Sequence, residues 1–150
     1  EDLIAALSLY RPGPAKFIDT FLKNRQNPEE ITYSDPRLKD ILEVTFGIII
    51  YQEQVMQIFR KLAGYSLGRA DLVRRAISKK KMSVMEEERQ NFIEGKRNED
   101  GSIECIGAVQ NGVAKKDAEK IFEDMSSFAS YAFNKSHAAA YSYVSYQTAY

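Results

Sequence analysis

Apolar positions along this chain recur at the spacing of α-helices, and turn residues separate the stretches in which they do so. Within 15–25, for example, the apolar residues Phe17, Phe21 and Leu22 fall on one side of a helix. Comparable patterns predict helices over about 35–44, 52–63, 66–81, 83–95 and 114–130, an N-terminal helix capped by Asp2 and a last one that begins near Asn134. We therefore expect a mainly α fold, a single helical domain of about seven or eight helices.

Caps and turns set the boundaries between these elements. Asp35 and Pro36 form an N-cap and N1 pair, and Ser66 caps the helix that follows the Gly64 turn. The β-branched run 48–50 is compatible with a short buried strand or with an extended entry into the next helix. Asp-Gly and Asn-Gly turns lie between short apolar pieces near 97–113, so we expect a small irregular or hairpin-like insertion there.

Composition narrows the classes of protein only slightly. The 150 residues are 44% hydrophobic and 28% charged, which is ordinary for a globular domain that buries a core. Lysines and arginines together number 21 and so do the acidic residues, so the net charge indicates neither a nucleic acid nor a membrane as a partner. The lone cysteine fits a reducing compartment, and no apolar run is long enough to span a bilayer. We expect a cytoplasmic location, and the ends of the chain predict a piece of a longer protein.

Positive charge is concentrated on one predicted helix. Residues 69–81 contain six basic side chains and one acidic one, a local charge of 6 − 1 = +5. A helical wheel places an apolar face toward the core, made of Ala70, Val73 and Ile77 and extended by Leu72 and Ala76. The opposite face is then expected to carry Asp71, Arg74, Arg75 and Ser78, with the two arginines pointing outward together.

Two interpretations of this basic face remain open at this point. In the first it is a solvated surface, on which Asp71 and Arg75 form an i,i+4 ion pair that contributes ~0.3–0.5 kcal/mol. In the second it is a phosphate site, because the adjacent Arg74 and Arg75 offer planar, permanently charged groups for bidentate contacts with phosphate oxygens. The charge pattern alone does not choose between them.

A second candidate site lies at the start of the last helix. Asn134 or Ser136 can cap this helix, which leaves backbone N–H groups available to an anion. Lys135 adds a positive charge and His137 a protonatable ring. The alternative is a capped helix whose histidine is hydrogen-bonded in a core. Tyr141, one turn after His137, is a candidate for stacking on a base or sugar.

Several kinds of chemistry find no support in the sequence. With one histidine and one cysteine there is no Cys/His cluster, and no Asp-x-Asp pair is present to hold two metal ions. The Gly-Lys-Ser/Thr of a P-loop does not occur. We therefore expect no metal site within these residues.

Four sequence blocks carry a resemblance to a known family. They are "ALSLYRPGP", "GIIIYQEQVMQI", "LAGYSLGRADLVRRAISKKK" and "YAFNKSHAAAYSYVSYQTAY", in this order. Together they closely resemble the fingers region of the bacterial replicative DNA polymerase III alpha subunit, a C-family polymerase of the DnaE type. The resemblance runs over nearly the whole chain, so 1–150 is expected to be a fragment that corresponds to the fingers domain.

The resemblance implies a role for the basic helix. Fingers of this family close over the incoming deoxynucleoside triphosphate (dNTP), and the positions that match Arg74 and Arg75 face the triphosphate. Lys79 and Lys80 would add positive field there or touch the DNA backbone. The residues expected to contact DNA are Lys80, Lys81 and Tyr141.

The resemblance also implies roles for the second site. The block that matches 134–137 lies near the nascent base pair, so Asn134, Lys135, Ser136 and His137 would hold the nucleotide or the primer end. His137 is in addition the candidate catalytic residue, as a proton donor to the departing pyrophosphate.

The resemblance implies that this chain is one part of an enzyme. The carboxylates that hold two Mg²⁺ ions belong to the palm, outside these residues, so the fragment is expected to be inactive alone as a DNA-directed DNA polymerase. Expected partners are dNTP, primer–template DNA and the remaining domains of the alpha subunit, with the sliding clamp and clamp loader bound through regions outside this chain and no membrane. The alternatives are a helical nucleic-acid-binding module without nucleotide chemistry and a scaffold whose basic face meets an acidic protein.

Overall fold

The structure, a computed structural model, describes residues 4–5, 9–10, 14–129 and 135–149. These residues form seven α-helices and one two-stranded hairpin, which confirms the mainly α prediction. The α-helices are α2 (Ile18–Gln26), α3 (Pro36–Leu42), α4 (Gln52–Ala63), α5 (Leu67–Ser78), α6 (Met82–Glu94), α7 (Lys115–Ala129) and α8 (Lys135–Ala149). Three short 3-10 helices join them: η1 (Pro14–Phe17), η2 (Pro28–Glu30) and η3 (Glu43–Thr45). Asp2, the expected first cap, lies outside the described residues.

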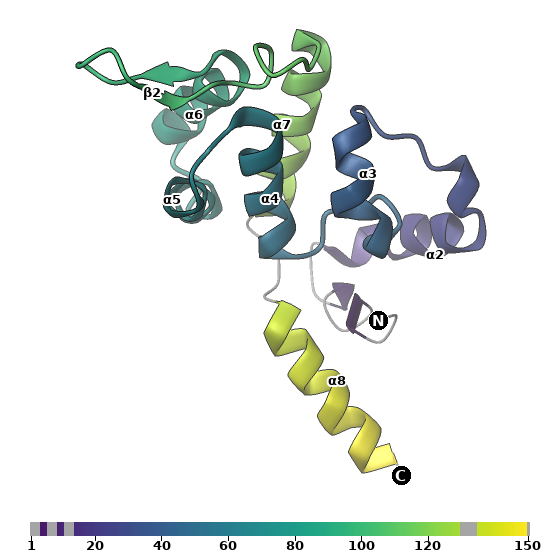
Figure 1. Cartoon of the computed structure of the whole chain (residues 1–150). Helices are drawn as coiled ribbons and strands as arrows, with labels where there is room; N and C mark the ends of the chain where they lie inside the picture. Colours follow the sequence, from purple (N-terminus) through teal and green to yellow (C-terminus); the bar gives the residue numbers. More distant parts are fainter. Residues whose placement is uncertain (1–3, 6–8, 11–13, 130–134, 150) are drawn as a thin grey trace.

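The main hydrophobic core is built around α4. Figure 1 shows α4 and α7 side by side, with α5 and α6 on one flank and α3 on the other. Phe59 of α4 is fully buried, and its ring lies 4.9 Å from Tyr65, 5.5 Å from Phe92 and 6.4 Å from Phe122, measured between centroids. Edge and tilted packing of such rings adds to the area they bury. This aromatic cluster joins α4, α6 and α7 to Tyr65, which lies in the turn before α5.

A second, smaller cluster lies beneath α2. It contains Phe21, Ile48 and Ile50, all buried. Phe128, near the end of α7, packs against both clusters, and its ring centroid lies 4.4 Å from that of Phe17. Leu22 is 47% exposed, so only part of the expected apolar side of this helix is buried.

A buried glutamine holds the passage from α3 to α4. The side chain of Gln54 accepts hydrogen bonds from the backbone N–H groups of Ile50 (2.9 Å) and Tyr51 (3.0 Å). Its amide donates to the hydroxyl of Thr45 (2.8 Å), and that hydroxyl donates to the carbonyl of Ile48 (2.6 Å). Because this extended segment has few partners within regular structure, the side chains satisfy its polar groups. The run 48–50 is therefore an extended entry and not a strand.

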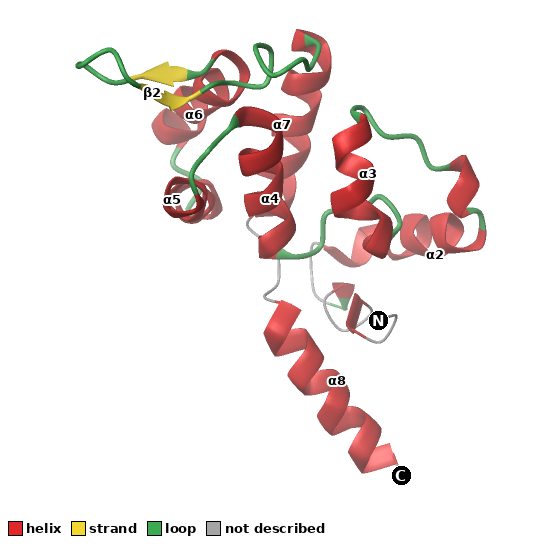
Figure 2. Cartoon of the chain, in the orientation of Figure 1, coloured by secondary structure: helices red, strands yellow, loops and turns green. Residues whose placement is uncertain are grey.

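The predicted insertion is a short hairpin. Strands β1 (Lys96–Arg97) and β2 (Ile103–Cys105) pair antiparallel, and the loop between them contains the expected Asp-Gly turn. Figure 2 shows the two yellow strands at one end of the molecule. After β2 the chain returns to the core, where Gly107 donates its N–H to Ala63 (3.0 Å). Burial raises the pKa of the Cys105 thiol.

Small differences from the predicted boundaries have local causes. Helix α6 begins at Met82, one residue before the expected Ser83. Lys80 takes a left-handed conformation (φ 53°), which turns the chain sharply enough for α6 to start at once. Within the described ranges, no helix is both long enough and apolar enough to cross a bilayer.

We expect a tight glycine contact to be required for this fold. Gly107 has φ +84°, and a Cβ there would lie 2.4 Å from the backbone nitrogen of Gly95. Gly107→Ala should therefore lower the free energy of opening of the hairpin region by at least about 2 kcal/mol. Amide hydrogen exchange of α6 and β2 measures this. Gly68→Ala is the matched control, because a Cβ at that helical position meets nothing within 4 Å and is expected to stabilise by roughly 0.5 kcal/mol. Equal protection in both variants would contradict the assignment.

Candidate functional site

The basic residues of interest are presented by α5, a helix with a firmly packed inner face. The Ser66 side chain caps it by accepting a hydrogen bond from the N–H of Arg69 (3.2 Å). Ala70, Val73 and Ile77 are buried, and the helix packs against α4, α6 and α7. Side chains on the rest of α5 therefore start from a backbone that is held in place.

The predicted apolar face was too wide. Leu72 is 66% exposed and does not extend the buried face. At 100° per residue, position 72 lies roughly 130° from the centre of the face formed by Ala70, Val73 and Ile77. The prediction of the three core positions is confirmed, and the extension of the apolar face to Leu72 is wrong.

The arginine pair, Arg74 and Arg75, is held by one carboxylate. Nη2 of Arg74 lies 2.7 Å from Oδ1 of Asp71, and its Nε donates to the same oxygen at 3.3 Å. Nη2 of Arg75 lies 2.9 Å from the other oxygen, Oδ2. The expected Asp71–Arg75 pair is confirmed, and Asp71 also binds Arg74. The pKa of Asp71 is lowered, mainly by the hydrogen bond from the Arg74 guanidinium. The carboxylate is therefore ionised at neutral pH.

The two arginines do not point outward together, as the wheel led us to expect. The side chain of Arg74 is 13% exposed, whereas that of Arg75 is 65% exposed. Position 74 lies roughly 70° from the centre of the buried face and position 75 roughly 170° from it. Arg74 therefore lies along the flank of α5, and Arg75 projects into solvent.

Arg69 belongs to a different, structural arrangement. Its two terminal nitrogens lie 2.8 Å from Glu88 of α6 and 2.7 Å from Glu104 of β2. Tyr65 donates to the other oxygen of Glu88 (3.1 Å), and burial together with this carboxylate raises the pKa of Tyr65. Arg69 thus joins α5, α6 and the hairpin. The sequence predicts Arg69 as part of the basic patch, and its position roughly 70° from the centre of the buried face distinguishes it from Arg75 but not from Arg74.

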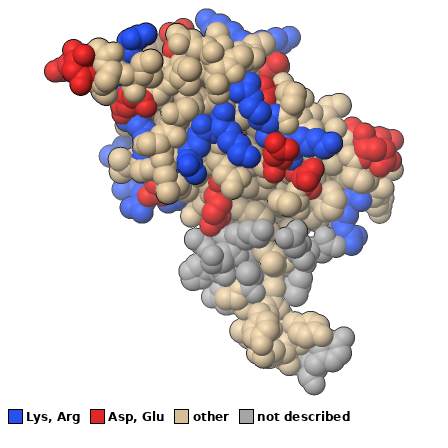
Figure 3. Space-filling view, viewed as in Figure 1, with Lys and Arg blue, Asp and Glu red and all other residues tan. Residues whose placement is uncertain are grey.

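The lysines that follow α5 remain at the surface. Lys79 forms its C-cap, and Lys79, Lys80 and Lys81 are all exposed. Cations are favourable at a helix C-terminus, where the backbone carbonyls gather negative partial charge. On the face in Figure 3, basic side chains lie over α4 and its neighbours, and acidic side chains are interspersed among them. Because the whole chain has 21 basic and 21 acidic residues, the charge excess of residues 69–81 is local.

The second predicted site is described only through its backbone. Lys135, Ser136 and His137 lie in the first turn of α8, as expected for a helix start near this point, but their side chains lie outside the described parts. Asn134 and the Tyr141 side chain also lie outside them. Figure 1 shows α8 extending away from the body of the molecule. The roles expected of these residues stay predictions.

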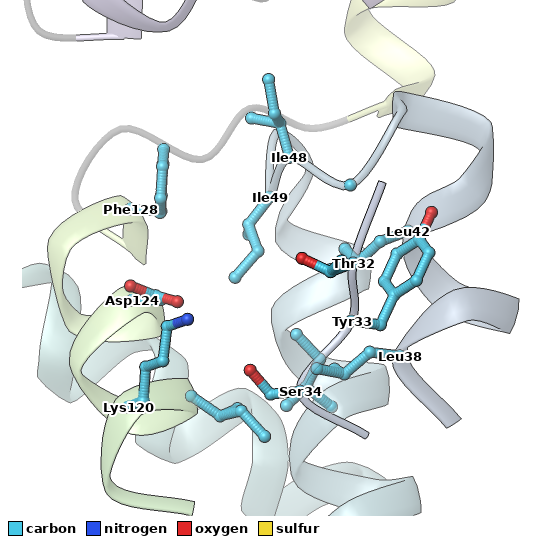
Figure 4. Close-up of a pocket in the computed structure, with 13 residues that line it drawn as sticks. Thr32, Tyr33, Ser34, Leu38, Leu42, Ile48, Ile49, Lys120, Asp124 and Phe128 are labelled. Carbon is cyan, nitrogen blue, oxygen red and sulfur yellow. The ribbon is translucent and has the colours of Figure 1, made fainter. Parts of the chain in front are cut away.

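The structure also contains a cavity of about 190 Å³ that no pattern in the sequence predicts. It lies between the segment 32–34, α3, the extended entry and α7. Figure 4 shows Lys120 and Asp124 of α7 facing Ser34 and Ile49 across it. Burial raises the pKa of Asp124, and the charge of Lys120 opposes that rise. Of the predicted site residues whose side chains the structure describes, none lines this cavity.

No metal site was predicted in these residues. Within the described parts of the chain, no three His, Cys, Asp or Glu side chains gather in a way that would hold a metal ion. The positive charge of α5 is suited instead to binding an anion.

We expect the arginines of α5 to contribute unequally to stability. Arg69→Ala leaves the 8% exposed Glu88 side chain without its ion pair, and should cost about 2–3 kcal/mol. Arg75→Ala removes an exposed pair and should cost less than about 0.5 kcal/mol. Amide hydrogen exchange of α5 and α6 measures both. Greater loss of protection in the Arg75 variant than in the Arg69 variant would contradict this division.

Comparisons with known proteins identify the relatives of this chain. Residues 1–100 match the family model of the bacterial DNA polymerase III alpha subunit finger domain. The chain is 51% identical over its whole length to the DNA polymerase III subunit alpha of Treponema pallidum, and 45% identical to that of Thermus aquaticus. It is 43% identical to that of Aquifex aeolicus. In each case it spans 12% of the length of the relative.

Proposed function

Because this chain belongs to the family of bacterial DNA polymerase III alpha subunit finger domains, we propose that it binds the triphosphate of the incoming dNTP through Arg74 and Arg75. The observation that carries this proposal is the arginine pair itself. Two guanidinium groups share one carboxylate on a helix whose other side is packed into the core. The pair keeps a net positive charge and retains N–H donors for phosphate oxygens.

The reaction that this site serves is template-directed nucleotidyl transfer by the complete subunit. The primer 3′-hydroxyl attacks the α-phosphate of the dNTP, and pyrophosphate leaves. The guanidinium groups compensate the charge of the β- and γ-phosphates and hold them in position for the attack. The Mg²⁺ ions of such a polymerase have no ligand set among the described residues, and palm residues outside this chain are expected to hold them. The chain alone is therefore inactive in this proposal.

Other residues extend the proposed site. Lys79 and Lys80 add positive field to the same end of α5, and Lys80 and Lys81 contact the DNA backbone. The start of α8 holds the nucleotide or the primer end through Asn134, Lys135, Ser136 and His137. Tyr141 stacks on a base or sugar.

The chain spans 12% of the length of its relatives, so the remaining domains of an alpha subunit are proposed partners. Primer–template DNA and the remaining domains of the alpha subunit complete the site. The sliding clamp and the clamp loader bind through regions outside this chain.

The arginine pair can be tested in the full-length alpha subunit. We expect Arg75→Ala to lose a charge-assisted contact of roughly 1.5–3 kcal/mol, which lowers kcat/KM for dNTP by about tenfold to more than a hundredfold. DNA affinity should change much less. Steady-state kinetics and a DNA-binding titration measure the two quantities. Arg97→Ala, which removes an exposed arginine on the hairpin, is the control and should leave both unchanged.

The same experiment tests the main alternative, a helical nucleic-acid-binding module without nucleotide chemistry. In that case Arg75→Ala would weaken DNA binding and reduce its salt dependence, while the KM for dNTP stayed constant. This result would remove the triphosphate assignment. If dNTP protects Arg74 and Arg75 from a reagent that modifies arginines, this would support the triphosphate assignment independently.

The proposed proton donor has a test of its own. If His137 protonates the departing pyrophosphate, His137→Gln in the full-length enzyme should remove one ionisation from the pH–rate profile and change the solvent isotope effect. A profile and an isotope effect equal to those of the parent enzyme would exclude this role. The arginine assignment would stand in either case.

A further inference from the structure

Asp71 is the carboxylate that contacts both Arg74 and Arg75. We infer that Asp71 is a positioning residue that orients the guanidinium groups of Arg74 and Arg75 toward the triphosphate. This inference rests on the proposed function, because it assigns Asp71 to the same site. The negative charge of Asp71 lies beside the proposed site for the triphosphate, which is itself strongly negative.

The geometry of the three side chains supports this inference. One oxygen of Asp71 binds Arg74 at 2.7 Å, and the other binds Arg75 at 2.9 Å. Among the described residues, Asp71 is the only carboxylate that forms an ion pair with either arginine. The three contacts to Asp71 use Nε and Nη2 of Arg74 and Nη2 of Arg75. A guanidinium has five N–H donors, so each arginine retains donors for phosphate oxygens.

The helix makes this arrangement possible. Residues three and four positions apart are neighbours on a helix surface, so one carboxylate at position 71 reaches both 74 and 75. Two adjacent guanidinium groups repel one another, and a shared carboxylate offsets that repulsion. The helix carrying all three is anchored by the buried Ala70 and Val73. Asp71 therefore fixes the arginines relative to the core as well as to each other.

Asp71 also has an opposing effect, because its negative charge repels a triphosphate. Two observations indicate that positioning outweighs this repulsion. The side chain of Arg74 is only 13% exposed, so its guanidinium depends on a partner within the protein. Arg75, at 65% exposed, would otherwise sample many rotamers in solvent. The charge of Asp71 is compensated by two guanidinium groups at hydrogen-bonding distance, so its residual repulsion is small.

The sign of the effect of Asp71→Asn separates the two contributions. In the full-length alpha subunit, this substitution raises the local charge by one. If Asp71 positions the arginines, the KM for dNTP should nevertheless rise, with kcat/KM falling by roughly tenfold while the Kd for DNA is unchanged. Asp71→Glu, which keeps the charge, should restore part of the loss. Glu86→Gln is the matched control, because Glu86 forms an exposed i,i+3 pair with Arg89 (3.9 Å).

Two results would overturn the inference. A lower KM for dNTP in Asp71→Asn would show that the carboxylate only competes with the ligand. An unchanged kcat/KM would show that Asp71 forms an ordinary surface ion pair and has no part in binding dNTP. Amide hydrogen exchange of α5 checks that the helix stays folded. If it does not, the kinetics of Asp71→Glu decide: a KM for dNTP raised by less than roughly tenfold supports positioning, because the charge is kept but displaced, and an unchanged or lower KM opposes it.

The positioning role also predicts coupling between residues. Asp71→Asn combined with Arg75→Ala should cost less than the sum of the two single effects on kcat/KM, because part of the effect of Asp71 acts through the Arg75 guanidinium. Additive effects would count against the inference. This outcome is distinct from failure of the proposed function, in which Arg75→Ala alone leaves the KM for dNTP unchanged.

Discussion

A single carboxylate placed between two guanidinium groups organises the charged side of α5. Asp71 binds Arg74 with one oxygen and Arg75 with the other. The arrangement requires that these side chains rise from a helix that does not shift, and the buried Ala70, Val73 and Ile77 supply that anchor. The aromatic core around Phe59 in turn holds the helices on which α5 rests. The arrangement of charge at the surface of α5 therefore depends on packing in the core.

Burial decides what each arginine of α5 does, although all three have the same chemistry. Arg69 lies between Glu88 and Glu104 and joins two helices to the hairpin. Arg74 lies along the flank of the helix, with little exposure, and Arg75 projects into solvent. A planar, permanently charged group can serve as a structural tie or as a ligand for an anion. Arg69 has two carboxylate partners and ties elements together, whereas Arg74 and Arg75 share one carboxylate.

The family assignment and the geometry answer different questions. The chain belongs to the family of bacterial DNA polymerase III alpha subunit finger domains, as the family model over residues 1–100 and the relatives show. The geometry shows which basic groups remain available on α5 after internal pairing. In our proposal this chain contributes charge compensation and positioning, and the catalytic groups belong to the rest of a longer protein. That division is consistent with a chain that spans 12% of the length of its relatives.

Local patterns in the sequence determined the helices, their caps and the hairpin. Ser66 and Asp35 cap helices as expected, because capping depends on neighbouring residues alone. The pair of Asp71 with Arg75 was also predictable, since a helix brings positions four apart together. The sequence did not reveal that Arg69 is consumed by Glu88 and Glu104, which lie 19 and 35 residues further along the chain.

The tertiary structure alone decided how far each side chain is exposed. Periodicity identifies the direction of a buried face but not its width, because the width depends on which helices pack on either side. Arg74, on the flank of this face, is covered by that packing and is only 13% exposed, whereas Leu72 lies too far round the helix to be covered. The sequence by itself determined where the positive charge of this protein is concentrated. Only the packing of α5 among α4, α6 and α7 decided which of those charges face solvent, since that depends on contacts between residues distant in the chain.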